Sequence, residues 1–278
     1  MQLSNNPSVI VRDVSKKYLV SKDGSEVGLS LARRGFEIEA LQPLSFVVER
    51  GQSIGIIGKN GSGKSTLLNL IAGHEKPTSG EIWVGAQPAL LSVSAALQSH
   101  LSGRQNIRLG LFASGLTPTK VNEIEDNVVR WAEIGSAIDR PIKTYSSGMG
   151  ARLRFAIATA VRPDILLVDE ALATGDSAFK AKAEERMAEF LDNAATVFIV
   201  SHAAATIRKN CTRALWIHEG ELIADGPAHS VTGLYSKWSR ALSKKDTKLA
   251  NQIIRRARRQ YVAPKIVLDK EAALKLGG

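Results

Sequence analysis

A glycine-rich stretch at residues 58–66 carries residue types that bind phosphate. It reads Gly58-Lys59-Asn60-Gly61-Ser62-Gly63-Lys64-Ser65-Thr66 and matches the pattern G-x-x-x-x-G-K-[ST] in full. Glycines let the backbone turn its N–H groups towards a β-phosphate, and the start of a helix adds partial positive charge beside them. The stretch therefore predicts a phosphate-binding loop.

The two polar side chains at the end of this loop predict how it would use a nucleotide. We expect Lys64, as a solvent-facing point charge, to reach the β- and γ-phosphates, and the Ser65 hydroxyl to hold Mg²⁺. An apolar strand over 53–57 precedes the loop, and an apolar helix follows it from 66 to 72. This strand-loop-helix context favours phosphate binding over the alternative, a glycine-rich turn that binds nothing.

Two adjacent carboxylates, Asp169 and Glu170, end an apolar run at 165–168. A buried parallel strand delivers acids to a nucleotide in this way, so Asp169 suits the second contact to Mg²⁺, although a plain surface edge is the alternative. A further apolar strand, 196–200, ends at Ser201 and His202. Because parallel strands end at one sheet edge, His202 is expected beside the two acids.

The remaining elements must position these groups. Residues 8–15, 37–41 and 44–48 alternate as strands, which indicates a mostly antiparallel start, and the polar, glycine-punctuated residues 19–38 predict an exposed insertion. Helical spacing covers 102–142 with a break at 115–118. Further predictions are a helix at 151–158 after a small-residue cluster, a helix at 177–192, and a hairpin of strands 213–218 and 221–226. The pattern indicates an α/β fold with a helical insertion.

Charge is concentrated at the end of the chain. The 278 residues are 44% hydrophobic and carry a net charge of +10, and residues 241–278 contain ten Lys or Arg against three acids. The body is thus nearly neutral, which argues against nucleic-acid binding by the body. For the basic segment three interpretations stay open: a solvated helix, a membrane or partner surface, or a nucleic-acid contact.

Cysteine content and hydropathy bear on location. Cys211 is the single cysteine, which favours a reducing compartment. The start of the chain lacks the pattern of a signal peptide, and no apolar run approaches the roughly 18 residues of a membrane span. We therefore expect any membrane role to come through a partner chain.

Taken together, these motifs resemble the nucleotide-binding subunit of an ATP-binding-cassette (ABC) transporter, over roughly residues 8 to 240. The loop at 58–66 resembles Walker A, and the strand at 165–169 resembles Walker B. The other matching positions are the signature residues Ser146, Ser147 and Gly148, the catalytic glutamate Glu170, the D-loop Asp176, the switch histidine His202 and the adenine-stacking Tyr18.

The resemblance implies ATP and Mg²⁺ as cofactors. It assigns catalytic roles to Glu170, His202 and Lys64, nucleotide contacts to the loop and to the signature, D-loop and stacking residues, and metal contacts to Ser65 and Asp169. It also implies the fold of a P-loop NTPase, with a parallel core sheet, an antiparallel β subdomain and a helical insertion subdomain at about 95–160. The expected ATP-binding domain is 1–240, with 241–278 as a basic C-terminal tail.

Two departures from the family pattern narrow the resemblance. The signature reads Tyr-Ser-Ser-Gly-Met at 145–149, and the region at 91–95 lacks the expected Q-loop glutamine, for which Gln98 is too late. Both departures are similar to the branch that exports O-antigen, teichoic acid and capsular polysaccharide, and most of all to the actinobacterial exporter of lipid-linked galactan. The insertion at 19–38 fits that branch, where it implies a loop near the permease and the substrate.

This resemblance implies a head-to-tail homodimer that acts with a polytopic permease on a lipid-linked glycan, at the cytoplasmic face of the inner membrane, with no nucleic acid as partner. The alternative is a soluble ABC-type ATPase that acts on nucleic acid or the ribosome. Such proteins usually need a second cassette or a long coiled-coil insertion, and this sequence contains neither.

Overall fold

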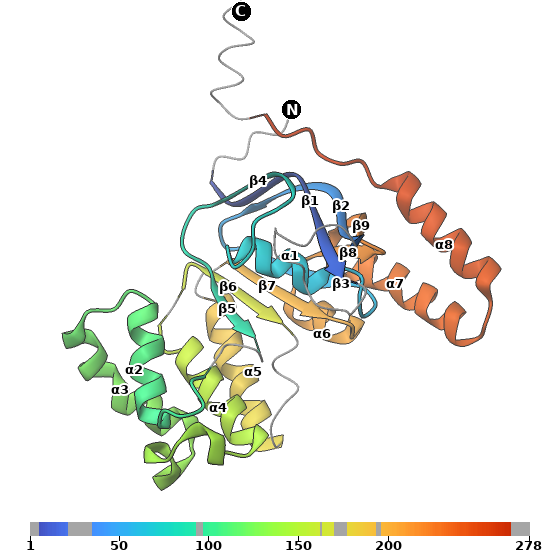
Figure 1. Ribbon diagram of the computed structural model, residues 1–278. Helices are drawn as coiled ribbons and strands as arrows, with labels where there is room; N and C mark the ends of the chain where they lie inside the picture. Colours follow the sequence, from blue (N-terminus) through green and yellow to red (C-terminus); the bar gives the residue numbers. More distant parts are fainter. Residues whose placement is uncertain are drawn as a thin grey trace, which may run out of the picture.

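A six-stranded sheet forms the centre of the molecule (Figure 1). The computed structural model describes residues 6–21, 35–92, 97–161, 163–169, 177–192 and 196–267. The strand order is β5-β6-β7-β3-β8-β9, and every pairing is parallel except that of β8 with β9. The strands are β3 (Ser53–Ile57), β5 (Ala89–Ser92), β6 (Ile165–Asp169), β7 (Thr196–Ser201), β8 (Arg213–His218) and β9 (Glu221–Pro227).

The central strands are covered on both faces, which explains their unbroken apolar runs. β3 and β7 are buried at every residue. Along β7 the side chains alternate: Val197 and Ile199 pack in one core cluster, and Phe198 and Val200 pack in another. The hydrophobic clusters on the two faces of the sheet therefore both include side chains of β7.

An antiparallel sheet lies over one face. It has the order β2-β1-β4 and contains β1 (Pro7–Ser21), β2 (Gly35–Glu49) and β4 (Ser79–Val84). The two strands expected at 37–41 and 44–48 are one strand, because β2 stays paired with β1 through several register shifts. The expected insertion at 19–38 begins and ends in strand, since Leu19 pairs with Glu37 and Ser21 with Gly35. Residues 22–34 lie outside the described part of the chain.

A helical lobe lies below the sheets in Figure 1. It contains α2 (Gly103–Ala113), α3 (Pro118–Ala132), the 3₁₀ helices η1 (Gly135–Asp139) and η2 (Ile142–Thr144), and α4 (Ser147–Ala158). The expected break at 115–118 is confirmed: Gly115 has φ 81°, and Thr117 caps α3 at the residue before Pro118. The lobe has its own core, which includes Ile107 and Leu153.

Five helices cover the central sheet: α1 (Lys64–Ile71), α5 (Ser177–Asp192), α6 (Ala204–Asn210), α7 (Ala228–Ser243) and α8 (Thr247–Gln260). The expected domain boundary at residue 240 falls inside α7. α8 packs on the body through Ala250, Ile254 and Ala257, and Tyr261 donates a hydrogen bond to the Ser45 carbonyl at 3.2 Å. In the described part of the chain, no helix combines the length and apolarity that a membrane span requires. The expected α/β fold class is confirmed.

Candidate functional site

The phosphate-binding loop connects β3 to α1, and two of its glycines are required by contact. At Gly58, a Cβ atom would lie 2.3 Å from the Ile217 carbonyl oxygen. At Gly63, φ is 103°, and a Cβ atom would lie 2.6 Å from the Ala40 carbonyl oxygen. The loop is therefore pressed between β2 and the end of β8, where a side chain at either position would displace it.

Lys64 does not face solvent, contrary to the expectation from the sequence. It is buried, with 6% of its surface exposed, and its Nζ donates a hydrogen bond of 2.7 Å to the Lys59 carbonyl. The loop curls round the ammonium group, so the charge is held inside the concavity where phosphates would lie.

The loop has polar groups that suit a phosphate. Gly63 precedes the first turn of α1 and supplies no side-chain cap to its N–H groups. Ser62 is 5% exposed, and its Oγ atom is buried without a hydrogen-bond partner among the described residues. Donors of this kind, together with the Lys64 ammonium, match the chemistry of a nucleotide phosphate.

The carboxyl edge of the sheet brings the predicted groups together. Asp169 ends β6 and pairs with Val200, and Ile57, the last residue before the loop, pairs with Ser201. His202 follows directly, and the Ser201 Oγ accepts a hydrogen bond from the Ala203 N–H at 3.0 Å, which forms the turn that carries His202. The expectation that His202 emerges at the edge of Asp169 is confirmed.

This edge offers oxygen ligands that suit Mg²⁺. Ser65 is exposed on the first turn of α1, and Asp169 is half-buried. Neither side chain hydrogen-bonds another described residue, so both oxygens are available. One hydroxyl and one carboxylate suffice, because Mg²⁺ completes its shell with phosphate and water. Glu170 and Asp176, the expected base and D-loop acid, lie outside the described residues.

Tyr18, the expected adenine-stacking residue, is engaged elsewhere in this structure. Its hydroxyl donates a 2.6 Å hydrogen bond to Glu75, beyond the C-terminal end of α1, and the Lys16 ammonium lies 4.9 Å from the ring centroid. Burial alone raises the pKa of Glu75, but hydrogen bonds from Tyr18 and Lys16 outweigh it and lower that pKa. An adenine ring would thus meet a ring that already carries a cation on one face.

The signature residues lie in the helical lobe, away from the phosphate loop. Ser146 is the N-cap of α4, where its Oγ accepts a hydrogen bond from the Met149 N–H at 3.2 Å; Ser147 and Gly148 form the first turn. α4 packs through Leu153 into the core of that lobe. The structure therefore presents Ser146 to Gly148 as an uncovered helix start on a separate part of the chain.

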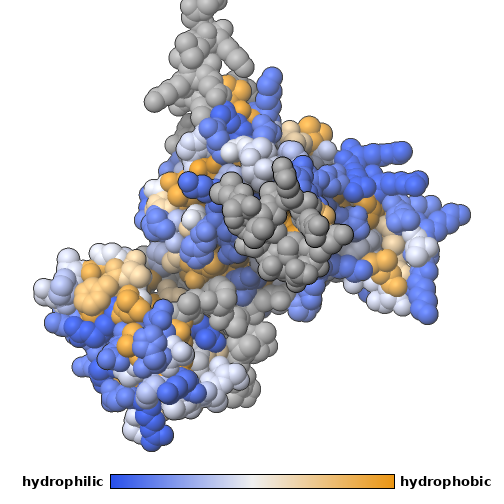
Figure 2. Space-filling view, viewed as in Figure 1, coloured by the Kyte–Doolittle hydropathy of each residue, from blue (hydrophilic) through white to orange (hydrophobic). Residues whose placement is uncertain are grey.

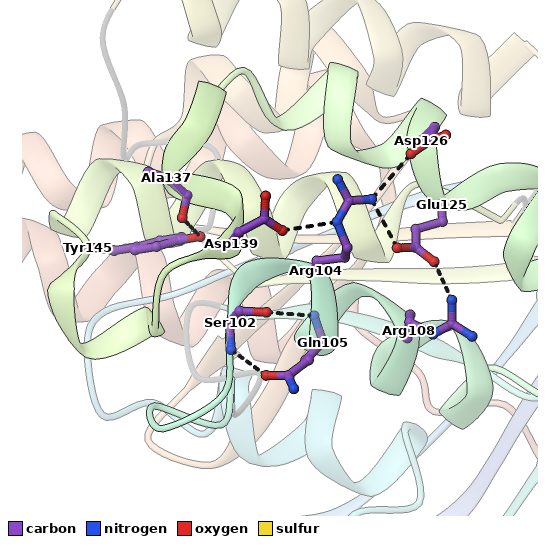
Figure 3. A network of polar contacts seen from close by, with 9 residues as sticks. All are labelled: Ser102, Arg104, Gln105, Arg108, Glu125, Asp126, Ala137, Asp139 and Tyr145. Carbon is purple, nitrogen blue, oxygen red and sulfur yellow. Dashed lines mark hydrogen bonds and ion pairs between the residues drawn. The ribbon is translucent and has the colours of Figure 1, made fainter.

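A polar network holds the segment before the signature (Figure 3). The Tyr145 hydroxyl donates a 2.7 Å hydrogen bond to the Ala137 carbonyl, and burial raises the pKa of this phenol. Nearby, Arg104 bonds Asp139 and the buried Glu125, which also accepts a 2.7 Å hydrogen bond from Arg108. These contacts tie α2, α3 and η1 into one unit that carries the signature helix.

Asn106 is a positioning residue that sequence reasoning missed. It is 3% exposed, its Oδ1 accepts a hydrogen bond from the Gln98 N–H at 2.7 Å, and its Nδ2 donates to the carbonyls of Gln98 and Ser102. It thereby fixes the chain where it leaves the sheet for the helical lobe. The signal in the sequence that could have identified it is one amide side chain, next to Ile107, on the apolar side of the expected helix.

Comparison with known proteins agrees with this geometry. A family model described as ABC transporter matches residues 41–173. A Listeria monocytogenes teichoic acids export ATP-binding protein is 35% identical over 246 residues, which cover 87% of this chain and 73% of that relative. The chain belongs to the ABC transporter family. A Bacillus cereus protein of the same description is 42% identical over 233 residues, which cover 83% of this chain.

The solved structures with this fold are more distant. A dimeric post-hydrolysis state of an ATP-binding cassette bound to ADP and Pi has a TM-score of 0.66 and 22% identity, covering 79% of this ABC family member and 98% of that chain. A subunit of a Clostridium perfringens ABC transporter complex has a TM-score of 0.60 and 20% identity, with 89% and 99% covered. The chain spans less than half the length of several relatives, 42% of the Bacillus cereus protein and 48% of one from Lactococcus lactis.

Proposed function

We propose that this chain binds and hydrolyses ATP as the ATP-binding subunit of an ABC exporter that moves a lipid-linked polysaccharide across the inner membrane. The observation that carries the proposal is the meeting of the phosphate loop, Asp169 and His202 at one sheet edge. The description of the relatives as teichoic acids export ATP-binding proteins supports a glycan of that class. Among the glycans that the wider branch exports, which include O-antigen, teichoic acid and capsular polysaccharide, the departures at 91–95 and 145–149 favour a cell-wall galactan.

In this proposal the loop positions the nucleotide. Lys64 leaves the Lys59 carbonyl and bonds the β- and γ-phosphates, while backbone N–H groups of residues 58–66 surround them. Tyr18 releases Glu75 and stacks on the adenine. Ser65 and Asp169 hold Mg²⁺, which when bound neutralises charge on the phosphate oxygens.

Glu170 follows Asp169 directly in the sequence, and we assign it the role of the base that accepts the proton of the attacking water. A carboxylate there can orient the water and accept its proton, while His202 detects the γ-phosphate from the neighbouring strand. The separation of roles between two adjacent acids is testable, because Asp169 would serve the metal and Glu170 the water.

The position of the signature residues supports a dimer. Ser146 caps α4 in the other lobe and Ser147 and Gly148 form its first turn, so these residues serve a nucleotide best on a second copy arranged head to tail. The proposed nucleotide contact of Asp176 rests on the family resemblance alone. Two solved structures with the same fold are described as dimeric. ATP would then join two copies, and hydrolysis would separate them.

The proposed binding site for the permease is a groove between the helical lobe and the sheet. This groove, about 550 Å³ in volume, is lined by residues of α2, α4 and β5, including Leu109 and Ala113. Leu109 is 46% exposed and Phe112 41%, and Figure 2 shows apolar surface on this lobe. The chain would act at the cytoplasmic face of the membrane through this contact, with the insertion at 19–38 towards the substrate.

Recovery of partners tests the proposal. The tagged chain is purified from detergent-solubilised membranes of its own cells, beside Leu109→Glu and the matched variant Leu249→Glu, whose residue on α8 is 44% exposed. We expect a polytopic membrane protein with the parent and with Leu249→Glu, and its loss with Leu109→Glu. Recovery of RNA or ribosomes in place of a membrane protein would support the soluble alternative.

A further inference from the structure

A cavity of about 540 Å³ lies on the outer side of the phosphate loop. It opens between residues 59–62 of the loop, the end of β8 with its turn, and the helices α7 and α8. Its walls therefore come from segments about 160 to 200 residues apart in the chain. The residues that line it include Lys59, Asn60, His218, Trp238, Ile254 and Arg255.

The rim of the cavity has more positive than negative charge. Arg258 is neutralised by Glu221, with 2.6 Å between Nη2 and the carboxylate, and Glu219 lies at the rim with 81% of its side chain exposed. In contrast, Lys59 and Arg255 form no ion pair with any described residue. Two unpaired cations that face one concave space create a positive potential inside it.

Neutral donors accompany these cations. The Asn60 and Asn251 amides line the cavity and make no hydrogen bond to other described groups. Burial lowers the pKa of His218, and the nearby Arg258 and Lys59 lower it further against the opposing effect of Glu219. The imidazole is therefore neutral at pH 7 and adds no positive charge, but it offers one N–H donor.

The floor of the cavity is apolar and aromatic. Trp238 is 3% exposed, and the Lys59 ammonium lies 5.4 Å from its ring centroid. The His218 ring meets the same indole edge to face at 5.2 Å, and Ile254, from α8, is 6% exposed beside it. The space thus combines a cationic rim with a floor on which a flat or apolar group can lie.

We propose that this cavity is a second anion site beside the nucleotide site, which binds a phosphate group carried on an aromatic or other apolar body. Lys59 and Arg255 contact the phosphate, the two amides donate to its oxygens, and the body lies against Trp238 and Ile254. The inference does not depend on the export function. Asp169 and His202, at the carboxyl edge of the sheet, do not line this cavity.

Because Lys59 belongs to both sites, the test uses full-length protein saturated with Mg²⁺ and a non-hydrolysable ATP analogue, which fills the phosphate loop. The four tryptophans are replaced by 5-fluorotryptophan, and the ¹⁹F signal of Trp238 is assigned from Trp238→Phe. Phenyl phosphate is titrated as the probe. Inorganic phosphate, which lacks the body, and phenol, which lacks the charge, are titrated in parallel.

We expect a saturable shift of the Trp238 signal with phenyl phosphate, and weaker binding of both partial probes. Arg255→Gln should weaken binding about fivefold, whereas Arg256→Gln, at an exposed position outside the cavity, should leave it unchanged. The proposal is overturned by an unmoved Trp238 signal, by equal weakening in the two arginine variants, or by phenol that binds as tightly as phenyl phosphate.

Discussion

Replacing Ile254 by alanine tests whether α8 belongs to the folded body. The side chain is 6% exposed and packs in the cluster that contains Trp216, Tyr235 and Trp238. The substitution removes three carbon atoms, worth about 0.8 kcal/mol each, and leaves a cavity that a peripheral helix partly closes. We therefore expect a loss of about 2 to 3 kcal/mol, which corresponds to about 4 to 10 °C in melting temperature.

Thermal unfolding followed by circular dichroism measures this change. The control is Leu249→Ala on the same helix, where the side chain is 44% exposed and the expected change is within about 0.5 kcal/mol. An Ile254→Ala protein that melts at the temperature of Leu249→Ala would refute the packing of α8 on the body. That result would favour a solvated helix for this segment.

Three further predictions concern other parts of the molecule. Glu125→Gln, which leaves Arg104 and Arg108 without their buried carboxylate, should cost about 1 to 3 kcal/mol in urea unfolding, whereas Asp126→Asn, 75% exposed, should cost under about 1 kcal/mol. Burial raises the pKa of Cys211 to about 12, so at pH 8 the thiol stays protonated and should react with a disulfide reagent much more slowly in folded than in urea-unfolded protein; equal rates would contradict its burial. Gly58→Ala should weaken nucleotide binding and lower the free energy of unfolding by about 1 to 3 kcal/mol, because the new Cβ would lie 2.3 Å from the Ile217 carbonyl oxygen. Gly226→Ala should change neither quantity, because a Cβ atom there would have nothing within 4 Å.

The local part of the site was predictable from sequence because its signals are local. The loop at 58–66 lies between adjacent elements, and the apolar runs before Asp169 and His202 are short parallel strands with polar ends. Since parallel strands end together, two runs distant in the chain were enough to predict one edge. The register of β6 with β7 then confirms that placement.

The contacts that individual polar side chains make in the folded chain were beyond this reasoning. The burial of Lys64 depends on a backbone carbonyl of its own loop, and the Tyr18 hydroxyl meets Glu75, 57 residues away. In α8, Ala250, Ile254 and Ala257 have helical spacing, but the many charges around them left three interpretations open: a solvated helix, a membrane or partner surface, or a nucleic-acid contact. Its packing follows from a small apolar stripe that meets α7.

In the proposed mechanism, Asp169 and Glu170 divide metal binding and water activation between them. Nucleotide affinity and steady-state ATP hydrolysis, measured on Glu170→Gln and Asp169→Asn while Mg²⁺ is varied, test it most directly. We predict that Glu170→Gln keeps ATP and Mg²⁺ binding but slows hydrolysis by about two to four orders of magnitude, and that Asp169→Asn raises the Mg²⁺ requirement. A Glu170→Gln protein that hydrolyses ATP at the parent rate would show that Glu170 is not the base.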